Sequence, residues 1–320
     1  KLGKKVEFAD SCFGQKAKID ALPAGSVLML ENTRFHPGEE ANDASFALML
    51  SVHGDLYVND AFSCAHRAHA STHAITRHMP SFAGPSLLTE IEALNRALEQ
   101  PEKPSIAIVG GAKVSSKIAV LRHVAARVDR LVIGGAMANT FPAALGYPQG
   151  RSLYEHEAVG IARQVMDDAR RHGCELILPE DLVVARDFAT NAPHRVVAAD
   201  AVPDDAMALD VGIRSINRIS TALAQSRTLL WNGPLGAFEI EPFGTATFAT
   251  AQKAADLTRQ GRLVSVAGGG DTAAAMTAAG IQNSLSHLST AGGAFLEWIE
   301  GRSLPGIEAL KQQSSILEHS

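Results

Sequence analysis

The amino-acid sequence predicts an α/β protein with parallel sheets. Short apolar runs recur along the whole chain and alternate with stretches in which apolar residues repeat at helical spacing. This alternation is typical of parallel strands that are covered by helices. The runs that we predict as strands are residues 27–30, 56–58, 105–109, 131–133, 176–178, 228–230 and 263–266. A length of 320 residues is enough for about two domains.

A helix predicted at residues 85–98 marks a domain boundary. Pro85 suits a first helical turn, and the sequence PEKP at residues 101–104 ends the helix. One helical face carries the apolar residues Leu87, Leu88, Ile91, Leu94 and Leu98. We therefore interpret residues 85–103 as a helix and linker. They follow an N-terminal domain at residues 1–84 and precede a larger C-terminal domain from residue 104.

The composition is that of a globular protein, with 46% hydrophobic and 20% charged residues. We find no apolar stretch of membrane-spanning length and no secretory signal pattern. Cys12, Cys64 and Cys174 are widely separated and odd in number, which argues against a disulfide framework and favours a reducing compartment such as the cytoplasm. The net charge of −5 gives no reason to expect nucleic acid as a partner.

Residues 105–117, SIAIVGGAKVSSK, predict a phosphate-binding turn. Gly110 and Gly111 follow an apolar strand and allow backbone N–H groups to approach an anion closely. Lys113 and Lys117 are four residues apart, so we expect them on one face of the next helix, beside its positive N-terminus. Neither the Walker A nor the GxGxxG spacing is present. The alternative is a purely structural turn followed by two solvated lysines.

Further glycine-bearing segments follow predicted strands or open the last helical stretch. They are residues 134–137, 231–236, 268–272 and 289–293. Ligands of open α/β sheets bind at the carboxyl ends of the strands, so we expect these turns to line a cleft for a base and a polyphosphate. We also expect that these glycines serve the close approach of the backbone to the ligand and are not required by packing alone. Asp271 either caps the helix at residues 272–279 or binds Mg²⁺ beside the polyphosphate.

In the N-terminal domain, Arg34 and Arg67 follow two predicted strands. A guanidinium group presents a planar fork to a carboxylate or a phosphate, so we predict an anion site here. The alternative is that both arginines pair with nearby carboxylates, namely Glu31, Glu39, Glu40 or Asp60. A zinc site is less favoured because its ligands do not form paired spacings in two segments. Its candidate ligands would be Cys64, His66, His69 and His73.

Eight segments occur in a characteristic order. They are LENTRFHPGEE, YVNDAF, AHRAHAS, IVGGAKVSSKI, IGGAMANTF, LWNGPLGAFE, VAGGGDT and STAGGAFLEWIEG. On these segments the chain resembles the phosphoglycerate kinase family, bacterial type. The resemblance implies two Rossmann-like, three-layer αβα domains with parallel sheets around a cleft. It places the C-terminal domain at residues 104–295 and returns residues 296–320 to the N-terminal domain.

The resemblance also implies a reaction and its residues. Members of the family transfer a phosphoryl group reversibly between 1,3-bisphosphoglycerate and MgADP, which gives 3-phosphoglycerate and MgATP in glycolysis. The implied catalytic residues are Lys113, Gly292 and Gly293, and the implied phosphoglycerate ligands are Arg34, Arg67 and His66. The implied nucleotide ligands are Gly110, Gly111, Lys117, Gly135, Asn232, Glu239, Gly269, Gly270, Asp271 and Thr272. Glu239 would bind the ribose, and Asp271 the Mg²⁺ of ATP or ADP.

The chemistry of the residues agrees with that assignment. A carboxylate nucleophile is already ionised at neutral pH, so the reaction needs no general base. Catalysis then consists of placement and charge neutralisation around an in-line transfer. We expect a cytoplasmic monomer whose partners are small-molecule substrates, with no nucleic acid and no membrane.

The chain departs from the family at its start. It opens at Lys1 and lacks the R-V-D-x-N segment and the H-L-G-R-P loop of the family. We therefore expect an incomplete N-terminal domain with uncovered apolar surfaces. The alternative to an active kinase is a noncatalytic nucleotide-binding remnant of the same family. A third hypothesis is a phosphotransferase that acts on a related acyl phosphate.

Overall fold

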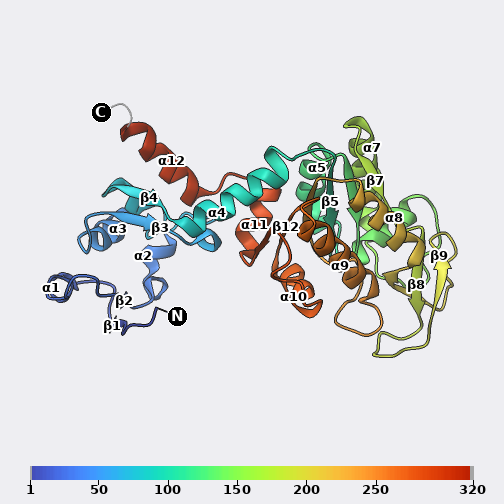
Figure 1. The fold of residues 1–320 in the computed structure, drawn as a ribbon, viewed down its shortest axis with the longest axis horizontal. Helices are drawn as coiled ribbons and strands as arrows, with labels where there is room; N and C mark the ends of the chain where they lie inside the picture. Colours follow the sequence, from blue (N-terminus) through green and yellow to red (C-terminus); the bar gives the residue numbers. More distant parts are fainter. Residues whose placement is uncertain (1, 318–320) are drawn as a thin grey trace. The chain divides into compact units, whose positions relative to one another are not determined.

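The computed structural model describes residues 2–317, and the chain divides into two compact units (Figure 1). Unit 1 comprises the residues up to Thr89 together with those from Ser303 onward, and unit 2 comprises Glu90–Arg302. Each unit is described by itself below. In the part of the chain that the structure describes, no helix is long and apolar enough to cross a membrane.

Unit 2 is built on a six-stranded parallel sheet. The strand order is β13-β12-β11-β5-β6-β7. The strands are β5 (Ser105–Val109), β6 (Arg130–Ile133), β7 (Glu175–Ile177), β11 (Thr228–Asn232), β12 (Val264–Gly268) and β13 (His287–Ser289). All residues of the central strands β5 and β11 are buried. The five strands predicted for this region are confirmed to within three residues at their ends, whereas β13 was not predicted.

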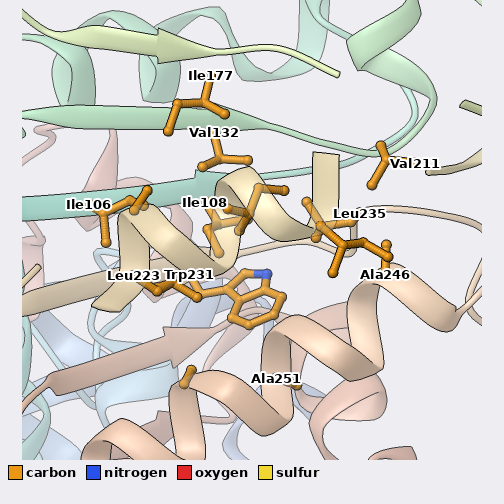
Figure 2. Packing of buried hydrophobic residues seen from close by; sticks show 14 of the residues in the cluster. Ile106, Ile108, Val132, Ile177, Val211, Leu223, Trp231, Leu235, Ala246 and Ala251 are labelled. Atoms are coloured by element: carbon orange, nitrogen blue, oxygen red, sulfur yellow. The ribbon is translucent and has the colours of Figure 1, made fainter. Parts of the chain in front are cut away.

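Helices cover the sheet of unit 2. On one face, α8 (Ile213–Ala224) and α9 (Thr245–Arg259) pack around the indole of Trp231, which is fully buried (Figure 2). Alternate residues of a strand point to opposite faces, so Ile106 and Ile108 join this core while Ala107 faces the other side. The helix α5 (Ile118–Ala125) contacts α7 (Val159–Arg171), α11 (Gly292–Ile299) and the strand β6, while α7 contacts β7 and α11 contacts β12. The remaining helical segments are η5 (Ser115–Lys117), η6 (Ala136–Asn139), α6 (Thr140–Ala144), η7 (His156–Ala158) and α10 (Gly270–Ala278).

A second sheet in unit 2 departs from the expectation of parallel sheets alone. The strands β8 (Asp181–Ala185), β9 (His194–Ala198) and β10 (Met207–Val211) form an antiparallel sheet in the order β10-β8-β9. Their apolar runs are short and close together in sequence, which is compatible with hairpin-like connections and with no intervening helix. This insertion lies between β7 and α8 in the chain and supplies one wall of the cavity described below.

Unit 1 contains two separate pairs of parallel strands. One pair is β1 (Glu7–Ala9) with β2 (Leu28–Leu30), and the other is β3 (Tyr57–Asn59) with β4 (Ser81–Ala83). The two predicted strands, β2 and β3, are confirmed, and β1 and β4 were not predicted. The helical segments are α1 (Lys16–Asp20), η1 (Thr33–Phe35), α2 (Pro37–Glu40), α3 (Ala44–Ser51), η2 (Phe62–Cys64), η3 (Ala74–Arg77) and α12 (Pro305–Leu317). A small core includes Cys12, Phe46, Leu50 and Ile75.

The strands of unit 1 expose apolar side chains. Phe8 and Met29 on the first pair are 53% and 62% exposed, and Val58 and Phe82 on the second pair are 47% and 48% exposed. The expectation of uncovered apolar surface in this part of the chain is therefore confirmed. In a two-stranded pair, each strand has a neighbour on one side only. The exposed side chains of these pairs are therefore less covered than those of the sheet in unit 2, over which helices pack.

The predicted helix at residues 85–98 is confirmed in outline. It consists of α4 (Pro85–Leu94) followed by a π-helical turn, η4 (Asn95–Glu99). In unit 1, α12 contacts η3 and β4, and the N–H of Gly306 donates to the carbonyl oxygen of Ala65 over 2.9 Å.

Candidate functional site

The glycine turns of unit 2 meet at the carboxyl edge of the six-stranded sheet, and most of their glycines serve packing. A Cβ atom on Gly110 would lie 1.9 Å from the carbonyl oxygen of Pro234, and one on Gly233 would lie 2.2 Å from the carbonyl oxygen of Gly110. Gly135 has a φ of +66°, and its Cβ would lie 2.5 Å from the carbonyl oxygen of Gly111. The expectation that packing alone does not require these glycines is therefore wrong, because here backbone packs directly against backbone.

Two other glycines face open space. Among the described residues, apart from the adjacent ones and the helix's own backbone, no heavy atom lies within 4 Å of a Cβ built on Gly270, and a Cβ on Gly292 would meet just the backbone nitrogen of Gly270, at 3.9 Å. Gly270 begins α10 and Gly292 begins α11, so the N-termini of two helices converge here. The first N–H groups of a helix have no partner within that helix, and together with the helix dipole they favour an anion. Gly293 lies in the same first turn of α11.

Lys117 is held at this edge of the sheet by Asn232. The Lys117 ammonium donates to Asn232 Oδ1, and Asn232 Nδ2 donates to the carbonyl oxygen of Gly268 over 2.7 Å. Burial lowers the pKa of Lys117 from 10.5 to about 8, although the charges of Asp271 and Glu300 act in the opposite direction. A partly desolvated cation therefore lies within the electrostatic reach of the first turn of α10.

Lys113 does not share a helical face with Lys117. It lies in the loop before η5 and is exposed, whereas Lys117 is the last residue of η5. The carboxylate of Glu155 accepts the backbone N–H of Ser115 over 2.9 Å and also the Ser115 hydroxyl. The prediction that Lys113 and Lys117 lie on one helical face is therefore wrong, and Glu155 occupies the first N–H group of η5.

Asp271 and Glu239 are exposed and line the same cavity. The N-cap of α10 is Gly269, with no hydrogen bond from a side chain, so the alternative that Asp271 is only an N-cap is wrong. The neighbouring Thr272 is buried, and its hydroxyl accepts the N–H of Gly233 over 2.7 Å. The Asp271 carboxylate is thus the oxygen ligand at this helix end that remains available to a cation.

A cavity of about 580 Å³ extends from the glycine turns. Gly111, Gly135, Gly236, Glu239 and Asp271 lie along it. Its other walls carry apolar and aromatic side chains that we did not predict from the sequence, among them Leu153, Tyr154, Phe188, Met207 and Leu209. They come from the antiparallel sheet and its neighbouring loops, so no strand-end motif could have identified them.

One wall of the cavity contains a buried carboxyl group. Burial raises the pKa of Asp210 to about 7, partly offset by hydrogen bonds from the N–H groups of Ala246 and Val211. Asp210 Oδ2 accepts the N–H of Ala246, in the first turn of α9, over 3.0 Å. Gly236 packs against this carboxyl group, so Asp210 fixes the loop that follows β11.

In unit 1, Arg34 and Arg67 are both exposed. Arg34 lies in η1, where its N–H donates to Asn32 Oδ1 over 3.0 Å, and Arg67 Nε lies 3.3 Å from His66 Nε2. Neither guanidinium forms an ion pair with any side chain that the structure describes. Their charges are therefore available to an anionic ligand.

The nearby carboxylates have other partners. Glu39 is buried and accepts the N–H and hydroxyl of Ser71, with His69 Nδ1 at 3.7 Å. Asp60 accepts the Ser86 hydroxyl and the N–H of Leu87, both over 3.0 Å. No ion pair of the described residues joins Arg34 or Arg67 to Glu31, Glu39, Glu40 or Asp60, so the alternative that these carboxylates pair with the arginines is wrong.

Metal-binding side chains are not clustered in the described structure. Between residues 2 and 317, no three His, Cys, Asp or Glu side chains lie close enough together to hold a metal ion. The set Cys64, His66, His69 and His73 accordingly does not form a site of this kind. A cation bound through Asp271 would have to take its remaining ligands from a substrate or from water.

The comparisons with known proteins agree with this geometry. A family model described as phosphoglycerate kinase matches residues 1–302. A phosphoglycerate kinase of Methylorubrum extorquens strain PA1 is 55% identical over 98% of this chain and 79% of its own length. The corresponding protein of Xanthobacter flavus is 54% identical over 97% of this chain and 79% of its own length.

Solved structures give the same result. A phosphoglycerate kinase from Coxiella burnetii matches 97% of this chain and 78% of its own chain, with 40% identity and a TM-score of 0.90. One from Pyrococcus horikoshii OT3 matches 97% of this chain and 79% of its own, with 30% identity and a TM-score of 0.79. On the family match, the sequence identity and the shared fold, the chain belongs to the phosphoglycerate kinase family.

Proposed function

We propose that this chain carries out reversible phosphoryl transfer between 1,3-bisphosphoglycerate and MgADP, which gives 3-phosphoglycerate and MgATP. The observation that carries the proposal is the convergence of the N-termini of α10 and α11, next to a cavity large enough for a nucleoside. Helix ends of this kind bind phosphate, and the cavity adjoins them through Asp271.

The nucleotide has a defined place in this proposal. Its base lies in the part of the cavity lined by Tyr154, Phe188 and Leu209, and Glu239 binds the ribose. Its phosphates lie at Gly269, Gly270 and Thr272, with Lys117 as the countercharge. Because Asn232 holds the Lys117 ammonium, we assign Asn232 a supporting role toward the phosphates. Asp271 binds the Mg²⁺ that enters with the nucleotide as part of the substrate.

The phosphoglycerate binds to unit 1 through Arg34, Arg67 and His66. The two guanidinium groups are exposed and without carboxylate partners among the described residues, so they retain full charge for a phosphate and a carboxylate. The acceptor carboxylate of 3-phosphoglycerate attacks without a general base. Lys113, Gly292 and Gly293 stabilise the charge on the oxygens of the transferred phosphoryl group.

A turnover assay with the variant Lys113→Ala tests the proposal. We expect the wild-type chain to convert 3-phosphoglycerate and MgATP, and we expect Lys113→Ala to lower kcat about 100-fold, as for the loss of one transition-state donor. MgADP affinity in calorimetry should change by less than about threefold. Lys253→Ala on α9, whose side chain does not line the cavity, is the control.

The outcomes separate the hypotheses. Unchanged turnover in Lys113→Ala would contradict the catalytic role of this lysine. A wild-type chain that binds MgADP but has no turnover would favour the noncatalytic remnant. Turnover with another carboxylate in place of 3-phosphoglycerate would favour a related phosphotransferase. A monomeric state and a cytoplasmic location stay predictions, and the second rests on three free cysteines.

A further inference from the structure

The Glu155 carboxylate clamps the first turn of the helix that follows Lys113. Glu155 Oε2 accepts the N–H of Ser115 over 2.9 Å, and Oε1 accepts the Ser115 hydroxyl over 2.5 Å. Burial alone would raise the pKa of Glu155, but hydrogen bonds from Ser115 and Val114 and the charge of Lys113 outweigh it and lower the pKa. The carboxylate is therefore ionised, and each of its two oxygens accepts a hydrogen bond from Ser115.

Glu155 is itself held by buried groups. Its N–H donates to the Thr140 hydroxyl over 3.3 Å, and Asn139 Nδ2 donates to the carbonyl oxygen of Leu153 over 3.1 Å. Asn139 and Thr140 are 4% and 0% exposed and belong to the helical segments that follow the Gly135 turn. The segment on both sides of Glu155 lines the cavity through Leu153, Tyr154 and His156.

Lys113 lies two residues before the clamped serine. Its carbonyl oxygen accepts the Ser116 hydroxyl over 2.9 Å, and the adjacent Val114 is fully buried. The backbone of this loop is thus fixed on one side by Glu155, while the Lys113 ammonium forms no ion pair among the side chains described. A cation on a fixed backbone, whose ammonium group forms no ion pair with a described side chain and is influenced by the nearby charge of Glu155, is suited to a moving phosphoryl group.

We propose that Glu155 is a positioning residue for Lys113. It acts on Lys113 through Ser115, and its own segment forms part of the wall of the nucleotide cavity. The proposal rests on the proposed function, because it assigns Lys113 to phosphoryl transfer. Glu155 contacts no substrate in this scheme. It places the lysine by fixing the turn in which the lysine lies.

Kinetics of Glu155→Gln test the proposal, with Glu157→Gln as the matched control. Glu157 is exposed, lies two residues further along the same segment and does not line the cavity. We expect Glu155→Gln to lower kcat about tenfold through misplacement of Lys113, while the KM for MgADP changes by less than about threefold. In Ser115→Ala, which keeps the backbone N–H, the loss should be smaller. The double variant should lose less than the product of the two single effects, because both act through one contact.

Hydrogen exchange supplies a readout that does not depend on turnover. In Glu155→Gln we expect peptides covering residues 111–117 to exchange faster by about tenfold, with unchanged exchange in peptides covering residues 268–272 and an unchanged Tm. Equal kcat and equal exchange in Glu155→Gln and Glu157→Gln would overturn the proposal. So would a parallel loss of kcat, nucleotide affinity and Tm, which indicates a purely structural residue. If the wild-type chain has no turnover, the proposed function fails while the exchange comparison still decides whether Glu155 fixes the lysine turn.

Discussion

Unit 2 and unit 1 differ in how far the apolar side chains of their strands are buried. The central strands of unit 2 are buried at every position, and their carboxyl ends pack through backbone contacts at Gly110, Gly135 and Gly233. The strands of unit 1 form separate pairs whose side chains Phe8 and Phe82 are about half exposed. The candidate site of unit 2 therefore rests on a buried scaffold with close backbone packing, whereas the exposed arginines of unit 1 follow strands that are only partly covered.

Truncation of one buried and one half-exposed aromatic side chain contrasts the stability of the two units. Trp231→Ala should lower the free energy of unfolding of unit 2 by about 3–5 kcal/mol, because Trp231 is fully buried and its indole N–H donates to Gly233. Phe82→Ala in unit 1 should change it by less than about 1 kcal/mol, because Phe82 is half exposed. Urea titrations read out by hydrogen exchange assign each change to its unit. If Phe82→Ala lowers the free energy of unfolding as much as Trp231→Ala does, the predicted difference between the two units is wrong, because Phe82 would then be buried in solution.

The next effect distinguishes packing glycines from open glycines. Gly135→Ala should cost about 2–3 kcal/mol, because its φ is positive and a Cβ would collide with the Gly111 backbone. Gly270→Ala should leave the Tm almost unchanged, because nothing lies near its Cβ position, but its methyl group should weaken MgADP binding about tenfold by taking the room of a phosphate. Thermal melts and calorimetry measure the two properties separately. If Gly270→Ala binds MgADP with unchanged affinity, the phosphates do not bind at the N-terminus of α10.

The smallest effect concerns pH and Lys117. Its folded-state pKa of about 8 lies below the ordinary 10.5, so between pH 8 and 10.5 the unfolded chain binds more protons and the free energy of unfolding rises with pH. Phosphate favours the ammonium form, so MgADP affinity should fall as the pH rises above about 8, by at most about tenfold per pH unit.

Calorimetry from pH 7 to 10 checks this dependence. In Lys117→Met the decline in MgADP affinity over this range should disappear, while overall affinity is lower at every pH. A decline that persists in Lys117→Met would assign the titration to another group.

The candidate site was predicted well where motifs occur at strand ends and poorly elsewhere. The glycine turns and Asp271 were expected at one edge of the sheet and lie there, because parallel strands bring their carboxyl ends to one edge whatever the intervening helices are. Lys113 and Lys117 were expected on one helical face, but Lys113 lies in the loop before η5. Tyr154, Phe188 and Leu209 could not be located, because they reach the cavity from loops and from an antiparallel sheet whose place depends on long-range packing.

The amino-acid sequence was sufficient to predict the α/β class, the alternation of strands and helices, the family, and the glycine turns at the strand ends. These follow from local periodicity and from short motifs, which do not need distant contacts. The contacts that each of these groups makes depend on the tertiary fold. In the folded chain most of the glycines serve backbone packing, and a carboxylate lies at the helix after Lys113. The arginines of unit 1 form no ion pair with the described residues. These contacts join residues that are far apart in the sequence, and local sequence patterns do not specify which distant residue will lie next to a given donor.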